Sequence, residues 1–463
     1  MTDLVDSVEE CVDRAISRVG KELVLMAPLG LGKPVQLVNA FYHRAASDPT
    51  ISLHIYTALC LERPPTGSGV EASLADPIMH RLFGDYEELA FIKPVRENTL
   101  PANIQVSELY FKAGSMKGVG SAQRNYISSN YTHIARDMFD AGANVLVQLV
   151  AARETADGLS ISLSCNPDTA LELGQMFGDS DRSYISIGQI HPDLPYMKND
   201  AEIGVGAMDL LVRNPDYDKT LFAVPNSAVP LQDYATALHA STLVADGGTL
   251  QIGIGALGDA VAYSCILRQE HNSAYCQAVE SLTHQHAAVA GHRESFDKGL
   301  YVSTEMFVNG MMQLIEHGVV KRKVYDNLAL QTGLNSGAIS TTIDERLFEY
   351  CRAQGVIPIH LGERDLETLT YWGILNSVTL ASADTLSVAG ESVPNNMDDH
   401  QTRSALLGAA EGAVLRNGRI LHGGFFLGPA DFYQKLRELD AHGQEQICMT
   451  GVQRPNLLVL DLP

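Results

Sequence analysis

Hydrophobic and polar residues follow one another in blocks that predict alternating strands and helices in the first part of the chain. Apolar runs at 22–27 and 51–57 are typical of strands, and the segment 34–47 between them has helical spacing. A glycine turn joins the first strand to the helix. This order is a βαβ unit, which predicts a parallel sheet covered by helices.

Similar signals surround this unit. The first residues predict an opening helix because four apolar positions share one helical face, Val5, Val8, Val12 and Ile16. Further strands are predicted at 143–152 and 183–190. A stretch with three prolines among polar residues, 213–230, interrupts the pattern. We therefore place a domain boundary there, between domains 1–220 and 221–463.

The second half repeats the order of the first. A helix is predicted at 231–243, followed by a strand, a glycine turn and another helix in DGGTLQIGIGALGDAVAYSCILRQ. The segment 29–38, LGLGKPVQLV, matches 252–261, IGIGALGDAV, in its G-x-G turn and in the apolar spacing that follows. We expect an α/β fold of two tandem domains, each with a largely parallel sheet covered by helices. Glycine turns at strand ends also favour a ligand between the two lobes.

Composition narrows the range of partners and compartments. The 33 basic and 55 acidic residues leave a net charge of −22, which argues against nucleic acid or an anionic membrane as the main partner. The seven cysteines include no CxxC pair, so a reducing compartment is expected. No apolar run reaches the roughly 18 residues of a membrane span, and the opening is unlike a signal peptide. A soluble, cytoplasmic protein is the expectation.

The second glycine turn fits the pattern G-x-G-x-x-G through Gly253, Gly255 and Gly258. Glycines let the backbone approach a phosphate, and the start of the following helix favours its negative charge. A nicotinamide cofactor would need an acid at the end of the next strand. Glu270 is the one acid near that spacing, and its surroundings lack strand character. A tight turn without a ligand and a site for a phosphate-bearing cofactor both remain open.

One carboxylate, Glu305, stands near the start of the mostly apolar stretch STEMFVNGMMQLIEHGVV. Ser303 or Thr304 could be the N-cap of a helix reaching about His317, with Glu305 favoured by the helix dipole. A functional carboxylate is the alternative.

Other polar segments give weaker signals. The histidines of THQHAAVAGH fit no standard ligand spacing, so no metal is expected at His284, His286 and His292. The chain lacks GxSxG, HExxH and a Walker lysine, the usual marks of serine hydrolases, zinc hydrolases and NTPases. The segment 126–140 is a polar loop entering a helix, with side chains that either cap it or contact a substrate. The segment 421–436 combines a glycine pair with a Gly-Pro turn before a helix, which favours packing.

Taken in order, LQIGIGALGDAV, GLYVSTEMFVNGMMQLIEHGVV and LHGGFFLGPADFY resemble the acetyl-CoA hydrolase/transferase family, the class I CoA-transferases. The segments PLGLGKPVQLVNA and YISSNYTH extend the resemblance over about residues 20–450. It implies two tandem CoA-transferase-like domains, the second carrying a catalytic glutamate. It also implies a homodimer.

The resemblance assigns roles to particular residues. Glu305 matches the glutamate that attacks an acyl-CoA thioester, passes through an acyl-glutamyl anhydride and becomes a glutamyl-CoA thioester. The CoA-binding loop is matched by Gly253, Ile254, Gly255, Ala256 and Leu257. Coenzyme A and acyl-CoA, acetyl-CoA in the first place, are then substrates, with no tightly bound cofactor. CoA would pass to a carboxylate acceptor, or to water in a hydrolase.

Some features depart from the family pattern. Asn309 stands where relatives carry aspartate, and no GxGGQ segment occurs, although longer relatives use one to bind CoA and supply oxyanion donors. Gly423 and Gly424 are candidates to substitute for it. We expect weaker activity than in longer relatives, because losing one oxyanion donor costs about 10²–10³ in rate. A CoA-binding protein without activity and a nicotinamide-dependent dehydrogenase are the alternatives. A last strand is expected at 457–463.

Overall fold

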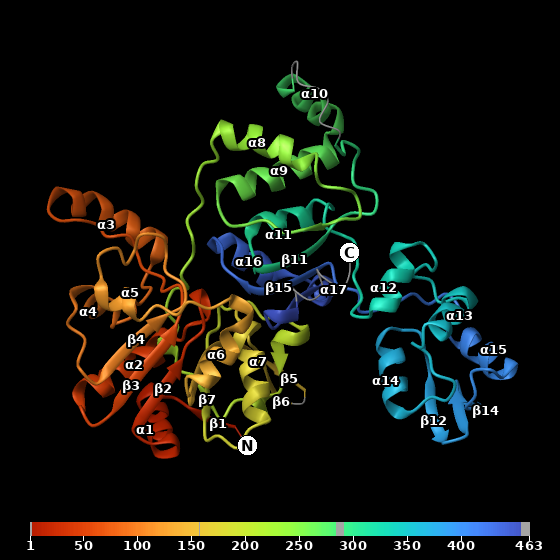
Figure 1. Ribbon diagram of the computed structural model, residues 1–463, viewed down its shortest axis with the longest axis horizontal. Helices are drawn as coiled ribbons and strands as arrows, with labels where there is room; N and C mark the ends of the chain where they lie inside the picture. The colour runs from red at the N-terminus through yellow and green to blue at the C-terminus, as the bar shows by residue number, and fades with distance from the viewer. Residues whose placement is uncertain (1, 157, 284–290, 455–463) are drawn as a thin grey trace. The chain divides into compact units, whose positions relative to one another are not determined.

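The computed structural model describes residues 2–156, 158–283 and 291–454 (Figure 1). The chain forms two compact units. The first runs to Val320 and resumes at Leu421, and the second is Lys321–Ile420. The strands up to Val212 and those from Thr249 belong to separate sheets. The division into domains 1–220 and 221–463 stays a prediction.

The larger sheet of the first unit has nine strands among the described residues. Its main path is β1-β9-β7-β5-β2-β3-β4, with parallel pairing throughout, and β6 adds antiparallel pairs to β5 and β8. The strands are β1 Asp3–Val5, β2 Glu22–Met26, β3 Ser52–Thr57, β4 Ile104–Glu108, β5 Val145–Thr155, β6 Gly158–Ser162, β7 Ile185–Ile190, β8 Glu202–Ile203 and β9 Leu210–Val212.

Helices cover both faces of this sheet because successive strand residues point to opposite faces. In β2, Leu23 and Leu25 join the core beneath α1, α2 and α4, whereas Val24 and Met26 pack with α6 and α7. The helices are α1 Val8–Val19, α2 Val35–Ser47, α3 Val70–Phe83, α4 Ile92–Glu97, α5 Gly120–Arg124, α6 Ile134–Asp140 and α7 Pro167–Gly178. Short 3-10 turns are η1 Gly30–Gly32, η2 Tyr131–His133, η3 Asn199–Ala201, η4 Val205–Ala207 and η5 Pro215–Tyr217.

The predicted βαβ unit is confirmed as β2, α2 and β3, and the strands predicted at 143–152 and 183–190 are β5 and β7. The opening segment differs from the prediction. Val5 ends strand β1, and the helix begins only at Val8, because the Ser7 side chain accepts a hydrogen bond from the Glu10 amide and caps it there.

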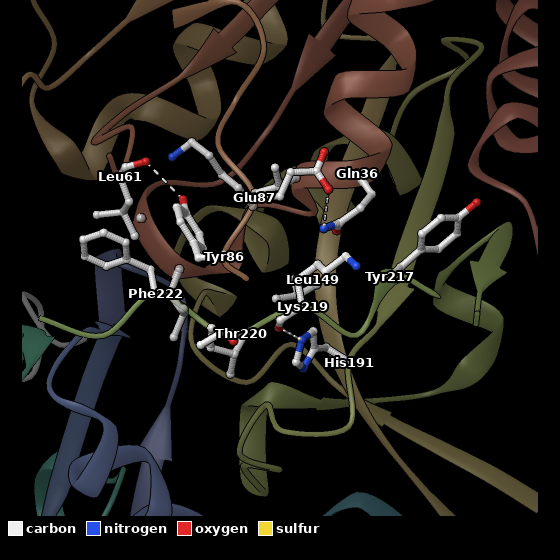
Figure 2. A pocket seen from close by; sticks show the side chains of 15 residues that line it. Gln36, Leu61, Tyr86, Glu87, Leu149, His191, Tyr217, Lys219, Thr220 and Phe222 are labelled. Atoms are coloured by element: carbon white, nitrogen blue, oxygen red, sulfur yellow. Dashed lines mark hydrogen bonds between the residues drawn. The ribbon is translucent and has the colours of Figure 1, made fainter. Parts of the chain in front are cut away.

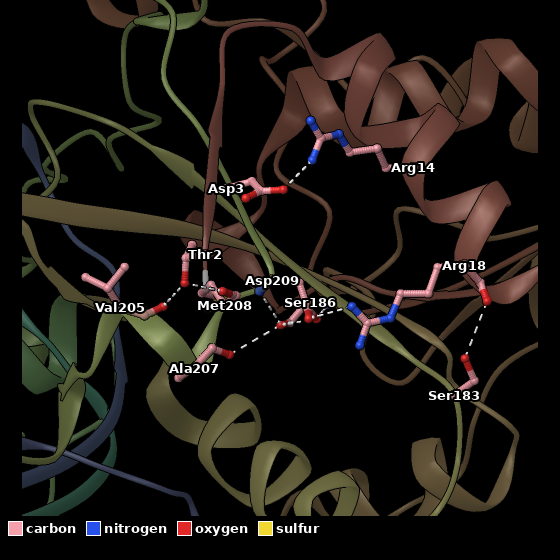
Figure 3. Close-up of polar contacts among 10 residues, drawn as sticks. All are labelled: Thr2, Asp3, Arg14, Arg18, Ser183, Ser186, Val205, Ala207, Met208 and Asp209. Carbon is pink, nitrogen blue, oxygen red and sulfur yellow. Dashed lines mark hydrogen bonds and ion pairs between the residues drawn. The ribbon is translucent and has the colours of Figure 1, made fainter.

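Polar contacts tie the first strand to the edge of the sheet (Figure 3). The Thr2 hydroxyl donates to the carbonyls of Val205 at 2.8 Å and Met208 at 2.7 Å. Arg18 pairs with Asp209 at 2.7 Å, and Asp209 also accepts from the Ser186 hydroxyl. The exposed ion pair contributes little free energy, so the backbone pairing of β1 with β9 is the main support for this edge.

The second sheet of the first unit is parallel, in the order β10-β11-β15-β16. Figure 1 shows α8, α9 and α11 stacked over β11. On α16, Phe432 packs edge-on against Phe307 and Phe426. The elements are β10 Thr249–Leu250, β11 Tyr301–Phe307, β15 Leu421–Phe426, β16 Ile447–Met449, α8 Leu231–Ser241, α9 Ala256–Glu270, α10 Asn272–Leu282, α11 Asn309–Glu316, α16 Ala430–Glu438 and α17 Ala441–Gln446.

The second unit has its own antiparallel sheet and its own core. The sheet has the order β12-β13-β14, and the core includes Phe348, Trp372 and Leu386. At its two ends, Val324 and Arg419 exchange a pair of backbone hydrogen bonds of 2.8 Å. The elements are α12 Leu328–Asn335, α13 Glu345–Ala353, α14 Glu363–Tyr371, β12 Val378–Ser382, β13 Thr385–Val388, β14 Glu391–Pro394 and α15 His400–Ala409.

Two sequence predictions lie outside the described residues: the last strand at 457–463, and the segment with His284 and His286. Across the described part of the chain, no helix has both the length and the apolar character needed to cross a bilayer. Among those same residues, no cluster of histidine, cysteine and acidic side chains is suited to hold a metal ion.

Candidate active site

Glu305 lies on strand β11, with β10 on one side and β15 on the other. The alternative of a helix capped by Ser303 or Thr304 is therefore wrong, because both residues are buried in the strand and the helix begins only at Asn309. Pairing with two parallel neighbours outweighs the local capping signal. The Glu305 side chain is half-buried at the position of the strand where it reaches a large cavity.

This cavity has a volume of about 1020 Å³ and lies within the first unit. Its walls come from the loops after β3 and β4, the segment before α6, the linker around Phe222, the second glycine turn and the two strands β11 and β15. Of the predicted site residues, Glu305, Gly253 and Ile254 line it together. Gly255, Ala256, Leu257, Gly423 and Gly424 do not line it.

The backbone of the second glycine turn has free space beside it at two positions. A Cβ added at Gly253 or Gly255 would meet nothing within 4 Å. Gly255 has φ +121° and caps α9, and Ala256 and Leu257 form the first turn of that helix. At Gly258 a Cβ would come within 2.1 Å of the Gly253 carbonyl, so only glycine lets α9 pack against the turn.

The matching turn in the first half is closed by the chain's own side chains. The Gly32 amide donates to Asn166 Oδ1 at 2.9 Å, and a Cβ at Gly32 would overlap that oxygen. The Lys33 ammonium group is buried and donates to the carbonyls of Ala58 and Leu59. Burial lowers the pKa of Lys33, while nearby Cys60 opposes that shift. The two related turns therefore differ, and only the second leaves its backbone accessible.

A buried acid beside Glu305 was not predicted. Asp168, in the first turn of α7, is fully buried, and Oδ2 accepts hydrogen bonds from the Tyr131 hydroxyl and from Asn166 Nδ2. Its Oδ1 has no partner among the described residues. Burial raises the pKa of Asp168 to about 6, although the bond from Tyr131 opposes this. Asn-Pro-Asp at a helix start was the available signal, and it indicates a cap as readily as a site.

Tyr131 connects this acid to the cavity. It lines the cavity together with Glu305, and its ring meets the edge of Phe425 at 6.1 Å between centroids. Burial raises the pKa of the Tyr131 phenol, and the charges of Asp168 and Glu305 add to the shift. In the 126–140 loop, Asn130 caps η2, as one interpretation predicted, and Tyr131 lies in the cavity wall, so contact with a substrate stays a prediction.

The glycine pair of β15 allows close packing beside Glu305. Thr304 pairs with Gly423 and Met306 with Phe425, which puts Gly424 opposite Glu305. A Cβ at Gly424 would come within 2.9 Å of the Glu305 carbonyl oxygen and 3.7 Å of Asp168 Cβ. A Cβ at Gly423 would meet the flexible Met449 side chain at 3.2 Å. Because Gly424 has no side chain, the strand that carries Glu305 can pack closely beside the start of α7, where Asp168 lies.

Two further sequence candidates lie away from the cavity wall. Asn309 opens α11, and its Oδ1 is buried without a partner in the described part of the chain. It lines a smaller hollow with Asp259 and Tyr263. Glu270 ends α9 and contacts His317 Nδ1 at 2.6 Å. It does not follow a strand, as the acid of a nicotinamide site would.

A small neighbouring cavity shares Leu61 and Phe222 with the large one (Figure 2). Its volume is about 30 Å³, room for roughly one water molecule. The Tyr86 hydroxyl donates to the Leu61 carbonyl at 3.0 Å, and His191 Nε2 contacts the Lys219 carbonyl oxygen at 2.7 Å. The first of these bonds fixes Leu61, which lines both cavities.

Comparison with known proteins identifies the fold. No family model matches the sequence, and no curated protein matches it. RipA from Yersinia pestis aligns with 98% of this chain and 69% of its own length, at 16% identity and a TM-score of 0.53. A 4-hydroxybutyrate CoA-transferase from Porphyromonas gingivalis aligns with 98% of this chain and 68% of its own, at 13% identity and a TM-score of 0.45.

The likeness to RipA shows the fold. It is an α/β fold with parallel sheets flanked by helices. The predicted fold class is confirmed. At this identity the relationship to such proteins is a distant one, so the chemistry has to be argued from the cavity itself.

Proposed function

We propose that this protein is an acyl-CoA-dependent enzyme in which Glu305 is the nucleophile. The observation that carries the proposal is that one cavity is lined both by the half-buried carboxylate of Glu305 and by the exposed glycine turn at Gly253 and Ile254. A carboxylate suits covalent chemistry of this kind because it is ionised at neutral pH and its acyl adduct is readily displaced.

The reaction proceeds by displacement at carbonyl carbons. A Glu305 carboxylate oxygen attacks the thioester carbon, the carbon–sulfur bond breaks, and CoA leaves as a thiolate with the acyl group on Glu305. The thiolate then attacks the glutamyl carbonyl, which releases the acyl group as a carboxylate and leaves a glutamyl-CoA thioester. A second carboxylate reverses these steps and leaves as a new acyl-CoA. If water attacks instead, free CoA is released and Glu305 is restored.

The cavity offers contacts for both ends of such a substrate. The glycine turn presents backbone at the start of α9, and Arg63, Arg96 and Lys112 also line the cavity. Arg96 pairs with Glu62 at 2.5 Å and Arg63 with Glu88 at 3.7 Å, so the phosphates of CoA would compete with these carboxylates, whereas Lys112 forms no ion pair with a described residue. Contacts remote from the thioester can hold it against Glu305 and exclude water.

The proposal is tested by mass spectrometry of the intact protein after incubation with acetyl-CoA. Borohydride then reduces a glutamyl thioester, and peptide mapping covers residues 299–321. We expect a CoA-sized adduct, or its reduced product, at Glu305. The Glu305→Gln variant keeps size and polarity but removes the nucleophile. It should lose the adduct and at least about 10³-fold in turnover while binding CoA nearly as well as the wild type.

Two results would contradict the mechanism. Turnover in the glutamine variant would exclude Glu305 as nucleophile. CoA binding by calorimetry, together with an unmodified peptide and no thioester exchange, would indicate a CoA-binding protein without this chemistry. An increase in NADH fluorescence on titration would instead favour the nicotinamide alternative.

A further inference from the structure

The segment that follows strand β3 forms a long part of the cavity wall. Every residue from 58 to 65 lines the cavity that Glu305 also lines. None of these eight residues belongs to a helix or a strand. Helix or sheet hydrogen bonds therefore do not fix this wall segment, and its shape depends on contacts with side chains from other elements.

The contacts toward the far end of the wall segment are partly exposed. Arg96 pairs with the Glu62 carboxylate at 2.5 Å, and the Arg63 amide donates to Glu88 Oε1 at 2.9 Å. Ion pairs that water can reach contribute little free energy, because the solvent screens both charges. These contacts therefore restrain the wall segment only weakly.

The near end of the wall segment is held by a buried ammonium group. Lys33 is 4% exposed, and its Nζ donates to the carbonyls of Ala58 and Leu59, the second at 3.2 Å. The Leu59 amide donates to the Tyr110 carbonyl at 2.8 Å. Burial of an ammonium group costs free energy unless it forms hydrogen bonds, and hydrogen bonds from a charged donor are the stronger ones. The two carbonyls and Lys33 therefore depend on each other.

The backbone of Leu59 explains why such support is needed here. Its φ is +43°, in the left-handed region, which is unfavourable for a bulky residue other than glycine. Strain of this kind persists only where the surroundings enforce it. The Ala58 carbonyl belongs to the peptide group before the Leu59 Cα, and the Leu59 carbonyl belongs to the group after it. One ammonium group thus fixes both peptide planes that define the strained conformation.

We propose that Lys33 is a positioning residue of the candidate active site, which holds Leu59 in its left-handed conformation and so fixes the wall segment beside the substrate. Lys33 acts from behind the wall, because it lines the small neighbouring cavity and not the large one. Its importance for catalysis rests on the proposed function of Glu305, whereas its effect on the wall segment does not.

Hydrogen–deuterium exchange of the full chain without substrate tests the effect on the wall segment. Lys33→Met keeps a long unbranched side chain and removes the ammonium group. Peptides that cover residues 58–66 should then exchange about tenfold faster or more than in the wild type. Lys21→Met is the matched control, because the Lys21 side chain is 54% exposed. It should leave the exchange of these peptides unchanged.

Substitutions at Leu59 separate this role from a general loss of stability. Asparagine adopts the left-handed region more readily than leucine does. In the Lys33→Met background, Leu59→Asn should therefore slow the exchange of residues 58–66 about threefold or more. Leu59→Ile keeps the volume but adds a branch at Cβ, which disfavours positive φ. It should speed the exchange although Lys33 is present, and it tests the same strain if Lys33→Met does not fold.

Turnover of acetyl-CoA tests the consequence for catalysis. Displacement of groups around the reacting atoms by about 1 Å can cost about 10² in rate. Lys33→Met should lower kcat/KM by about this factor, and Leu59→Asn in that background should recover part of the loss. Lys21→Met should keep the wild-type value. A wild type without a glutamyl adduct would overturn the proposed function of Glu305, and the exchange experiment would still decide the effect of Lys33 on the wall segment.

Three outcomes would overturn the inference. The first is wild-type exchange of residues 58–66 in Lys33→Met. The second is faster exchange throughout the chain, or no slowing by Leu59→Asn, because either would indicate a general loss of stability. The third is a wild-type kcat/KM in a Lys33→Met variant whose wall segment exchanges faster, which would show that catalysis does not depend on the position of this segment.

Discussion

Asp168 combines full burial with a carboxylate oxygen that has no partner among the described residues. Burial is the main cause that raises its pKa, and the bond from Tyr131 is the first of the opposing causes. An ionised carboxylate in this position is costly, because two hydrogen bonds to one oxygen do not replace the lost hydration of the other. The acid is therefore a source of pH-dependent stability close to Glu305.

The sign of this dependence follows from linkage. The pKa is raised from 3.8 to about 6 in the folded protein, so the folded state holds the proton more tightly. The stabilising contribution is fully present below pH ~3.8 and is lost as the pH rises through ~6. Asp168→Asn removes the titration. Relative to this variant, the wild type should lose up to about 3 kcal/mol of unfolding free energy between pH 4 and 7.

Urea unfolding of both proteins at several pH values measures this difference. Asp399→Asn is the control, because backbone and side-chain bonds from Thr402 lower the pKa of Asp399. A lowered pKa has the opposite sign in linkage, so relative to Asp399→Asn the wild type should gain rather than lose stability as the pH rises from 4. A flat profile for Asp168→Asn would show that Asp168 does not carry a raised pKa.

At the scale of elements, the junction of β11 with β15 depends on a single glycine. We predict that Gly424→Ala lowers both stability and turnover, because the new methyl group would lie 2.9 Å from the Glu305 carbonyl oxygen. Backbone must then shift, at a cost of about 1–3 kcal/mol. Gly423→Ala is the matched control, since the atoms nearest to its new methyl group are in side chains, the flexible end of Met449 at 3.2 Å and Leu421 Cδ2 at 3.5 Å.

Thermal unfolding and acyl-CoA turnover, measured on both variants, separate these effects. Equal losses of stability and turnover in the two variants would mean that any added methyl group on β15 is harmful, and not specifically one that lies against the Glu305 carbonyl. Unchanged turnover in a stably folded Gly424→Ala variant would show that the strand spacing at this point does not position the nucleophile.

The same junction shows where prediction from sequence succeeds and where it fails. Local patterns predicted β2, α2 and β3 almost to the residue, because their pairing partners lie next to them in the chain. They did not establish that Glu305 lies on a strand. Its partner, Gly424, is more than a hundred residues away, so the capping signal at Ser303 and Thr304 was the strongest local one.

The candidate site was predictable to a similar degree. Glu305 and the turn at Gly253 and Ile254 came from motifs, and the structure brings them into one cavity. Asp168 and Tyr131 were not paired in advance, because they come from separate elements and only the packing of η2 against α7 joins them. Long-range contacts of this kind leave no periodic trace in a single sequence.

At the scale of the whole molecule, the second unit is an insertion into the first. The chain leaves the first unit after Val320 and returns at Leu421, so Lys321–Ile420 interrupts two neighbouring parallel strands, β11 and β15. Insertions of this kind are tolerated where their ends are close together. The backbone pair between Val324 and Arg419 meets that condition.

We predict that the segment Lys321–Ile420 folds by itself. It has the size of a small domain, a separate core and a sheet that pairs with no other described strand. The single tryptophan of the chain, Trp372, is 8% exposed in this core, so its fluorescence reports on this unit alone.

The excised segment should unfold cooperatively in urea, with a slope of about 1–3 kcal/mol per molar. In the whole protein, fluorescence should give a similar midpoint, while circular dichroism follows both units. An unfolded segment, or one whose midpoint lies far below that of Trp372 in the whole chain, would show that contacts with the first unit are needed for its stability.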